Sequence, residues 1–381
     1  YTENAGAFSV YQKANKRICY HKFMDSAYLN ALNIAFGLSR IKKLIKVFRT
    51  AERAWNAPAG KILALNFDGE SIRDALKRKE TIDPKKEWEK LEKLDIKTIS
   101  FFEKTYPPLL KQISSAPMLL YLKGNTDLLK EKSLAVVGTR TPSSYGRAIV
   151  DDLVTKLAET GLVIVSGLAQ GIDALAHMAT LKANGKTIAV LGCGVDLVYP
   201  LMNIPIAKEI LNKNGLILSE YPAGTGALKQ NFPARNRIIA GLSLGTLVIE
   251  SKIDGGALIT AQQALESNRD VFALPGPINL PTCAGTNKLL REGAKVVLCV
   301  EDVLQEFNLK ELKGKEKIEM NLDKLSGNEK DIIDLILAEP AHIDKIIQTT
   351  KLKPHVVSAV LTGLELKGFI KNTGGQIYTI V

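Results

Sequence analysis

Seven short apolar runs rich in β-branched residues recur through the middle of the chain, and stretches of helical periodicity separate most of them. Continuous apolar strands that alternate with helices indicate a parallel sheet covered on both faces. We therefore predict a doubly wound, Rossmann-like α/β domain over residues 126–308. Its expected strands are 134–137, 162–165, 187–191, 216–218, 246–249, 271–274 and 295–300.

The N-terminal third has a helical pattern instead. Two sets of apolar residues recur at helical spacing over residues 29–36 and 41–48, with Gly37 between them. The pair resembles a SAM-like (sterile alpha motif) module, and a further helix is expected over Lys85–Leu94. The prolines that follow predict a connector, so residues 1–125 form a helical domain and its connector. Several basic residues lie on the second helix, which is equally consistent with a solvated helix face.

The C-terminal part predicts a small separate domain after a charged linker over residues 309–326. Helical patterns cover 329–337, 343–349 and 356–366, and two strand-like pieces flank Gly374-Gly375 as a hairpin. Three helices and a hairpin over residues 327–381 resemble a winged helix. Its recognition-helix candidate carries Glu365 and few basic residues, so contact with protein is as consistent with this domain as contact with DNA.

Charge is distributed unevenly along the chain. The net charge of +11 arises mostly from residues 1–132, which hold 25 Lys/Arg and 15 Asp/Glu, whereas residues 301–381 hold 11 and 13. A basic balance favours anionic partners. The four cysteines form no CxxC pair, which predicts neither a zinc site nor a disulfide framework and suits a reducing cytoplasm. No apolar run is long enough to predict a membrane span.

Small residues follow most of the expected strands. Gly138-Thr139-Arg140 follows the first strand, Ser166-Gly167 the second, and Gly192-Cys193-Gly194 the third. Ligands of open parallel sheets bind at the carboxyl ends of the strands, where glycine lets backbone N–H groups approach an oxyanion. Arg140 can add a bidentate contact to phosphate. Several such turns at one sheet edge predict an anion site.

A long loop is expected from Tyr221 to Arg237, because two prolines and two glycines interrupt any regular element there. It carries Lys229, Phe232 and the segment Arg235-Asn236-Arg237 without one acidic side chain. Positive charges with an aromatic ring suit a polyanion that has stackable bases. An ordinary solvated loop pinned to the core by Phe232 is the alternative.

Enzymatic groups are also present at these strand ends. Asp173 and His177 are one helical turn apart and could be a base and its orienting group, although a helix cap and a buried histidine explain them as well. Cys193 has no basic neighbour in sequence, so we interpret it as a small buried residue. Glu220 and Glu250 end strands and could position a sugar hydroxyl or hold Arg140 or Arg235.

Eight segments in one order resemble the DNA-processing protein A (DprA/Smf) family. They are GTR (138–140), SGLAQGID with AH (166–177), TIAVLGCGVDLVYP (187–200), LILSEYP (216–222), FPARNRIIAGLS (232–243), GGALITAQQA (255–264), VFALPG (271–276) and AGTNKLLREGA (284–294). The resemblance implies a cytoplasmic single-stranded-DNA-binding protein of natural transformation that protects incoming strands and helps load RecA recombinase. It also implies a homodimer through the Rossmann domain, and neither catalysis nor a cofactor.

The resemblance assigns roles to individual positions. Arg140 matches the family's phosphate-binding arginine, Lys229 and Phe232 its lysine and base-stacking aromatic, and residues 235–237 its RNR segment. The segment Asp254-Gly255-Gly256-Ala257 departs from the Ser-Gly-Ser that the family tends to have, which removes possible phosphate donors. The expected DNA-binding residues are Gly138, Thr139, Arg140, Ser166, Gly167, Lys229, Phe232, Arg235, Asn236, Arg237, Gly255 and Gly256.

The alternative from another class is a nucleotide-processing Rossmann enzyme. Residues 244–250, LGTLVIE, faintly resemble the PGGxGTxxE motif of cytokinin-activating phosphoribohydrolases, without the leading Pro-Gly-Gly. A dinucleotide-dependent oxidoreductase is disfavoured, because the first turn, GTRTPSSYG, does not fit G-x-G-x-x-G.

Overall fold

The computed structural model describes residues 25–309 and 327–380, apart from residues 68, 367–368 and 373. The chain forms two compact units, residues 1–313 and 314–381. Almost all of the expected linker over 309–326 lies outside the described residues.

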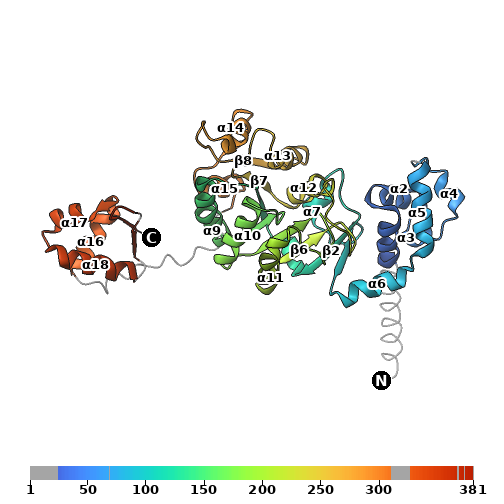
Figure 1. Ribbon diagram of the computed structural model, residues 1–381, viewed down its shortest axis with the longest axis horizontal. Coiled ribbons are helices and arrows are strands. Elements are labelled where there is room, and N and C mark those ends of the chain that lie inside the picture. The colour runs from blue at the N-terminus through green and yellow to red at the C-terminus, as the bar shows by residue number, and fades with distance from the viewer. Residues whose placement is uncertain (1–24, 68, 310–326, 367–368, 373, 381) are drawn as a thin grey trace, which may run out of the picture. The chain divides into compact units, whose positions relative to one another are not determined.

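A nine-stranded sheet organises the first unit (Figure 1), with the strand order β1-β2-β6-β5-β4-β3-β7-β8-β9. The strands from β6 to β9 are parallel, while β1 and β2 add an antiparallel edge. The predicted doubly wound Rossmann-like fold is therefore confirmed. The strands are β1 (Lys97–Ser100), β2 (Leu119–Gly124), β3 (Ser133–Val137), β4 (Val163–Ser166), β5 (Thr187–Leu191), β6 (Leu216–Ser219), β7 (Gly245–Val248), β8 (Asp270–Ala273) and β9 (Lys295–Val296).

The segment that was expected to be a connector contains β1 and β2, so the sheet begins at Lys97 and not after residue 125. The prolines that suggested a connector lie between these strands. Pro107 and Pro108 begin the short helix α7 (Pro108–Gln112), where a missing N–H costs little, and Pro117 precedes β2. The prolines therefore obscured two strands in the sequence pattern, of which β2 is stabilised by pairing with β6 and β1 by pairing with β2.

Alternate residues of the central strands point into different cores. Leu134 and Val136 of β3 pack with one helical layer, while Ala135 and Val137 pack with the other. This accounts for the continuous apolar runs, because both faces of the sheet are covered. The helices of this part, with short 3₁₀ or π turns marked η, are η1 (Thr126–Lys130), α8 (Ser144–Ile149), η2 (Val150–Val154), α9 (Thr155–Glu159), α10 (Ile172–Lys182), η3 (Leu201–Asn203), α11 (Ile204–Asn212), α12 (Asn231–Leu242), α13 (Gly256–Glu266), η4 (Pro281–Cys283), α14 (Ala284–Arg291) and α15 (Val300–Glu306).

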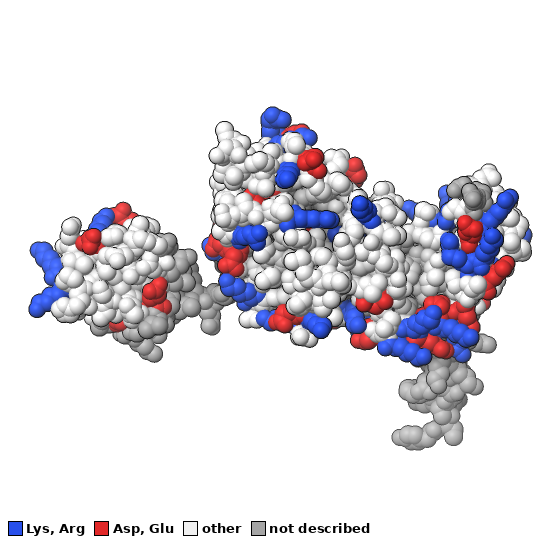
Figure 2. All heavy atoms as spheres, in the orientation of Figure 1, with Lys and Arg blue, Asp and Glu red and all other residues white. Residues whose placement is uncertain are grey.

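The N-terminal region is helical, as its periodicity predicted. A helix over residues 25–36 is followed by α2 (Leu38–Phe48), α3 (Ala51–Trp55), α4 (Ala59–Leu63), α5 (Gly69–Thr81) and α6 (Pro84–Lys93). Gly37 separates the first two helices with φ of +74°, a conformation that glycine adopts without strain. On the face in Figure 2, basic and acidic side chains are interspersed over these helices, so no patch of one sign covers that face.

The second unit is a winged helix, as expected. Helices α16 (Gly327–Ala338), α17 (Ile343–Thr350) and α18 (Pro354–Leu366) enclose one apolar core with a small sheet. Its strands are β10 (Ala341–His342), β11 (Ile370–Asn372) and β12 (Ile377–Ile380), and β11 with β12 forms the predicted hairpin.

Across the residues described in both units, none of the helices is long and apolar enough to cross a membrane. Those residues also contain no cluster of three His, Cys, Asp or Glu side chains suited to a metal ion.

Candidate nucleic-acid interface

The candidate site lies where the strand order reverses. The chain runs outward from β3 through β4 and β5 to β6, and then returns to place β7 against the other side of β3. In such sheets a crevice forms outside the carboxyl ends at the reversal. The turn after β3 is tied to that after β7, because the Thr139 N–H donates to the Glu250 carbonyl over 2.8 Å.

The expected loop from Tyr221 to Arg237 is only half a loop. From Asn231 onward the chain is α12, so the prediction was wrong for residues 231–237. Pro233 lies in the first helical turn, where backbone N–H groups have no partner within the helix and its missing donor is tolerated. Phe232 and the arginines that follow are therefore held on a rigid helix. Lys229 remains exposed in the loop before it.

Phe232 is the centre of the site. Its half-buried ring packs 5.6 Å from the Tyr199 ring, between centroids, and lies against Gly192, where an added Cβ would approach to 3.1 Å. The side chain of the neighbouring Asn231 donates to the Gly192 carbonyl over 3.0 Å and fixes the start of α12. The guanidinium carbon of Arg140 is 6.0 Å from the Phe232 centroid, within cation–π range.

Arg140 is exposed, and its backbone is fixed by a close contact with the next loop. Gly171 has φ of +88°, and a Cβ there would lie 2.3 Å from the Thr139 carbonyl oxygen. The same carbonyl accepts from the Ile172 N–H over 3.1 Å. The alternative that Arg140 pairs with Glu220 or Glu250 is wrong, because no ion pair joins these described residues. Glu220 pairs with Arg237, and Glu250 accepts hydrogen bonds from Ser143.

Arg235 is a core residue, which corrects the expectation that it faces a polyanion. It is only 3% exposed, and one guanidinium nitrogen donates to the carbonyls of Gly167, over 2.6 Å, and Val190. Burial lowers the pKa of Arg235, and the carboxylate of Asp173 opposes that shift. The Arg235 guanidinium therefore joins the turn after β4 to strand β5 inside the protein.

Ser166 and Gly167 are likewise occupied inside the protein. The Ser166 hydroxyl donates to the Val136 carbonyl over 2.7 Å, and the Gly167 N–H donates to Asp173 over 3.1 Å. A Cβ on Gly167 would lie 2.6 Å from the Arg235 guanidinium carbon. These two residues therefore support the turn after β4 from inside the protein, and the groups expected to bind an oxyanion are already paired.

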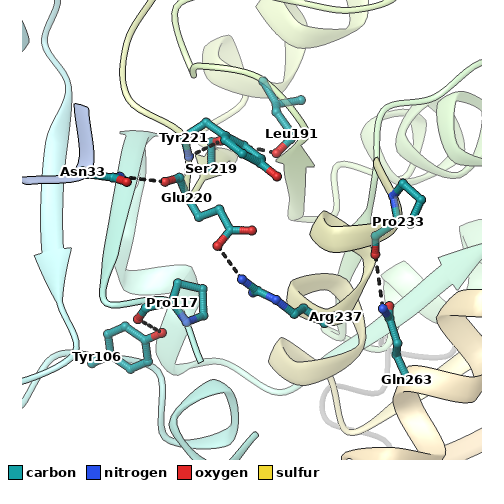
Figure 3. Close-up of polar contacts among 10 residues, drawn as sticks. All are labelled: Asn33, Tyr106, Pro117, Leu191, Ser219, Glu220, Tyr221, Pro233, Arg237 and Gln263. Atoms are coloured by element: carbon teal, nitrogen blue, oxygen red, sulfur yellow. Dashed lines mark hydrogen bonds and ion pairs between the residues drawn. The ribbon is translucent and has the colours of Figure 1, made fainter. Parts of the chain in front are cut away.

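Arg237 forms an ion pair with Glu220 (Figure 3), with 2.5 Å between the guanidinium nitrogen and the carboxylate oxygen. Burial raises the pKa of Glu220, and Arg237 counteracts it. The Glu220 carbonyl also accepts from Asn33 over 3.1 Å, which joins the N-terminal helices to the loop after β6. Removing one partner of such a buried pair costs about 3–5 kcal/mol.

Glu250, the acidic residue of the enzyme alternative, has both carboxylate oxygens engaged. One accepts from the Ser143 N–H over 2.9 Å, and the other accepts from the hydroxyls of Ser143 and Thr282, over 2.5 and 3.1 Å. The side chain is fully buried. Glu250 thereby holds the segment after β3 in place through Ser143. Its carboxylate oxygens are therefore not available to a sugar hydroxyl.

The other catalytic candidates are buried as well. His177 is fully buried, its Nδ1 lies 2.7 Å from the Thr187 hydroxyl, and burial together with Arg235 lowers its pKa to about 3. Burial raises the pKa of Cys193 to about 11, so its thiol is not activated. These environments support the interpretation of both as structural residues.

The structure thus brings Arg140 and Phe232 together, on a frame formed by Gly138, Thr139, Ser166, Gly167 and Arg235. Asn236 is half-buried and accepts from Arg235 over 3.2 Å. Gly255 and Gly256 lie on another loop, at the start of α13, and a Cβ on Gly256 would meet no atom within 4 Å. Sequence reasoning missed Tyr199 as a ring neighbour of Phe232, although its place after an expected strand end was a usable signal.

Comparison with known proteins identifies a family that matches this chain. Residues 97–308 match the family model described as DNA recombination-mediator protein A, and residues 317–376 match the DprA winged helix domain. DNA processing protein DprA of Streptococcus pneumoniae is 49% identical over 210 residues, covering 55% of this chain and 74% of that protein. Protein Smf of Synechocystis is 34% identical over 374 residues, covering 89% of this chain and 94% of that protein.

Two solved structures are also similar. DNA processing protein A from Streptococcus pneumoniae matches with a TM-score of 0.64 and 41% identity, over 74% of this chain and 97% of that one. DNA processing protein A from Helicobacter pylori matches with a TM-score of 0.50 and 32% identity, over 56% and 95%. The latter structure is described as giving insight into a unique single-stranded DNA binding mode.

Proposed function

The chain belongs to the DNA recombination-mediator protein A family. We propose that it binds single-stranded DNA at Phe232 and Arg140, that it acts in the cytoplasm and that it catalyses no reaction. The observation that carries this proposal is the half-buried Phe232 ring on α12, with the exposed charge of Arg140 beside it. An aromatic ring stacks on any base, and a guanidinium binds phosphate, so the site would have little sequence preference.

A test follows from the ring itself, because it can stack only on a base that is already unstacked. Phe232→Ala should weaken binding to labelled oligo-dT by about 5- to 150-fold, the equivalent of roughly 1–3 kcal/mol per stacked base. Weak binding to the matching duplex should stay nearly unchanged in fluorescence anisotropy. Phe102→Ala, which removes an exposed ring that follows the edge strand β1, is the matched control. Equal losses on both substrates would exclude the stacking role.

On the basis of the family, we further propose that the bound strand is protected and passed to RecA recombinase during natural transformation. A protein that leaves both nuclease digestion of oligo-dT and RecA loading unaffected would contradict this.

We also propose a homodimer through the Rossmann unit. The sheet ends at the short strand β9, beside which Leu298 is 76% exposed and Leu265 of α13 is 57% exposed. An open sheet edge with exposed apolar side chains favours association with a second copy. A monomeric mass in sedimentation would contradict it.

A further inference from the structure

A cavity of about 510 Å³ extends to Tyr199, the ring neighbour of Phe232, and is formed by the loop after β5, by α11 and by strands β2 and β6. Its lining is mostly apolar, with Val195, Leu197, Leu201, Ile204 and Leu211 among the contributors. Cavities of this volume with apolar walls and a few polar groups accommodate small aromatic ligands. Leu201 is 73% exposed at the cavity, so the cavity is accessible from solvent.

Tyr199 connects this cavity to the candidate DNA site. It lines the cavity, is 49% exposed, and its ring lies 5.6 Å from that of Phe232 with 42° between the ring planes. Tyr199 lies in the loop after β5, whereas Phe232 lies in the first turn of α12. A single-stranded DNA with one base stacked on Phe232 would therefore bring a neighbouring base to Tyr199 and to the cavity that Tyr199 lines.

The charged groups around the cavity fit a base better than a phosphate inside it. Asp196 lines it, and both carboxylate oxygens accept from the Gly224 N–H over 3.0 and 2.9 Å. A fixed carboxylate opposes a phosphate but tolerates a neutral base. Lys123 and the exposed Lys208 also line the cavity and can neutralise the phosphates that flank an inserted base.

We propose that Tyr199 and this cavity form a second base-binding subsite, which takes a nucleobase of the same strand next to the base on Phe232. The proposal rests on the proposed function, since it requires a strand at Phe232. The proposal assigns Tyr199 to the DNA interface. It also extends the path of the bound DNA from the point where the β-strand order reverses toward α11.

The first measurement is oligo-dT affinity by fluorescence anisotropy. Tyr199→Ala should weaken binding by about 5- to 150-fold, while Tyr199→Phe, which keeps the ring, should bind as the unmodified protein does. Phe102→Ala is again the control for loss of an exposed ring. An unchanged affinity in Tyr199→Ala, with Phe232→Ala impaired, would overturn the subsite and leave the proposed function intact. Full affinity in Phe232→Ala would instead count against the proposed function.

The second measurement separates base binding from an indirect effect on Phe232. A single abasic position is moved along an oligo-dT strand, and the Tyr199→Ala and Phe232→Ala proteins are each titrated with every strand, as in a double-mutant cycle. The penalty of each variant should vanish when its own base is missing, at neighbouring but different positions. A Tyr199→Ala penalty that persists at all positions, or vanishes at the same position as that of Phe232→Ala, would overturn the proposal.

A third measurement distinguishes a base of the strand from a free nucleotide. Isothermal titration with dTMP alone should give binding far weaker than that of the strand. Tight dTMP binding that Tyr199→Ala abolishes while strand affinity is unchanged would make the cavity a mononucleotide site and would overturn the proposal.

Discussion

The arginines nearest the interface differ in what their guanidinium groups contact. Arg140 is exposed above the Phe232 ring, Arg237 pairs with the buried Glu220, and Arg235 donates to two backbone carbonyls in the core. A buried guanidinium contributes to stability because its removal leaves carbonyls and a carboxylate without partners. An exposed cation contributes mainly to binding.

The Arg235→Ala protein should therefore be less stable than the unmodified protein. Its main defect should be in folding stability and not in the loss of a contact with DNA. We expect the free energy of unfolding to fall by about 3–5 kcal/mol, because Gly167 and Val190 lose a donor and Asp173 loses its nearby charge. Urea denaturation measures this change. Lys229→Ala is the matched control: its stability should stay within about 0.5 kcal/mol while oligo-dT affinity falls. A stable Arg235→Ala protein with weakened DNA binding would show instead that Arg235 contacts DNA.

At the scale of elements, the site depends on loops from separate strands meeting at one sheet edge. Arg140 follows β3 and Lys229 precedes α12 in the segment after β6, and both side chains are exposed. Two cations on different loops can hold a DNA backbone at two points, while α12 holds the Phe232 ring next to Arg140. Such a clamp makes affinity depend on salt through counterion release.

Arg140→Ala and Lys229→Ala should each weaken oligo-dT binding and flatten the log–log salt slope by up to about 0.7, the contribution of one phosphate of a single strand. Reversal to Glu at either position should nearly abolish binding at moderate salt, because an anion then lies beside the phosphates. Lys182→Ala is a suitable control, since Lys182 is exposed and pairs with Asp151 on the surface of α10. Melting temperatures are measured alongside. Stable variants with unchanged slopes would argue against the clamp.

At the scale of the whole molecule, the winged helix has a core of its own. Its apolar residues form one cluster, separate from the three clusters that cover the sheet and pack the N-terminal helices. The candidate DNA-binding residues all belong to the first unit. The second unit therefore need not contribute to strand binding.

Deletion of residues 321–381 should change oligo-dT affinity by less than about threefold, or ~0.7 kcal/mol, because the interface and its supporting core stay intact. Anisotropy with the truncated protein provides the measurement, and circular dichroism confirms that the remainder is folded. A tenfold or larger loss in a folded remainder would show that the winged helix contacts the strand.

The sequence by itself determined the alternation of strands and helices and the winged-helix hairpin, and it named Arg140 and Phe232, which the structure brings side by side. Apolar runs bounded by glycine report a buried parallel strand directly, since both faces of such a strand are covered. Arg140 could be named because it directly follows an expected strand of a doubly wound sheet, and Phe232 because it stands among basic residues without an acidic side chain and matches the family's aromatic.

Only the tertiary structure decided which polar groups are free. Arg235, Ser166 and Gly167 have the residue types of an anion site, yet they are already paired: Arg235 and Ser166 donate to carbonyls far away in sequence, and Gly167 donates to the carboxylate of Asp173. The strands β1 and β2 were missed for the same reason, because the pairing of β2 with β6 and of β1 with β2 outweighs the prolines between them. Tyr199 acquires its meaning from a ring 33 positions along the chain, a proximity that depends on how the loops after β5 and β6 fold together.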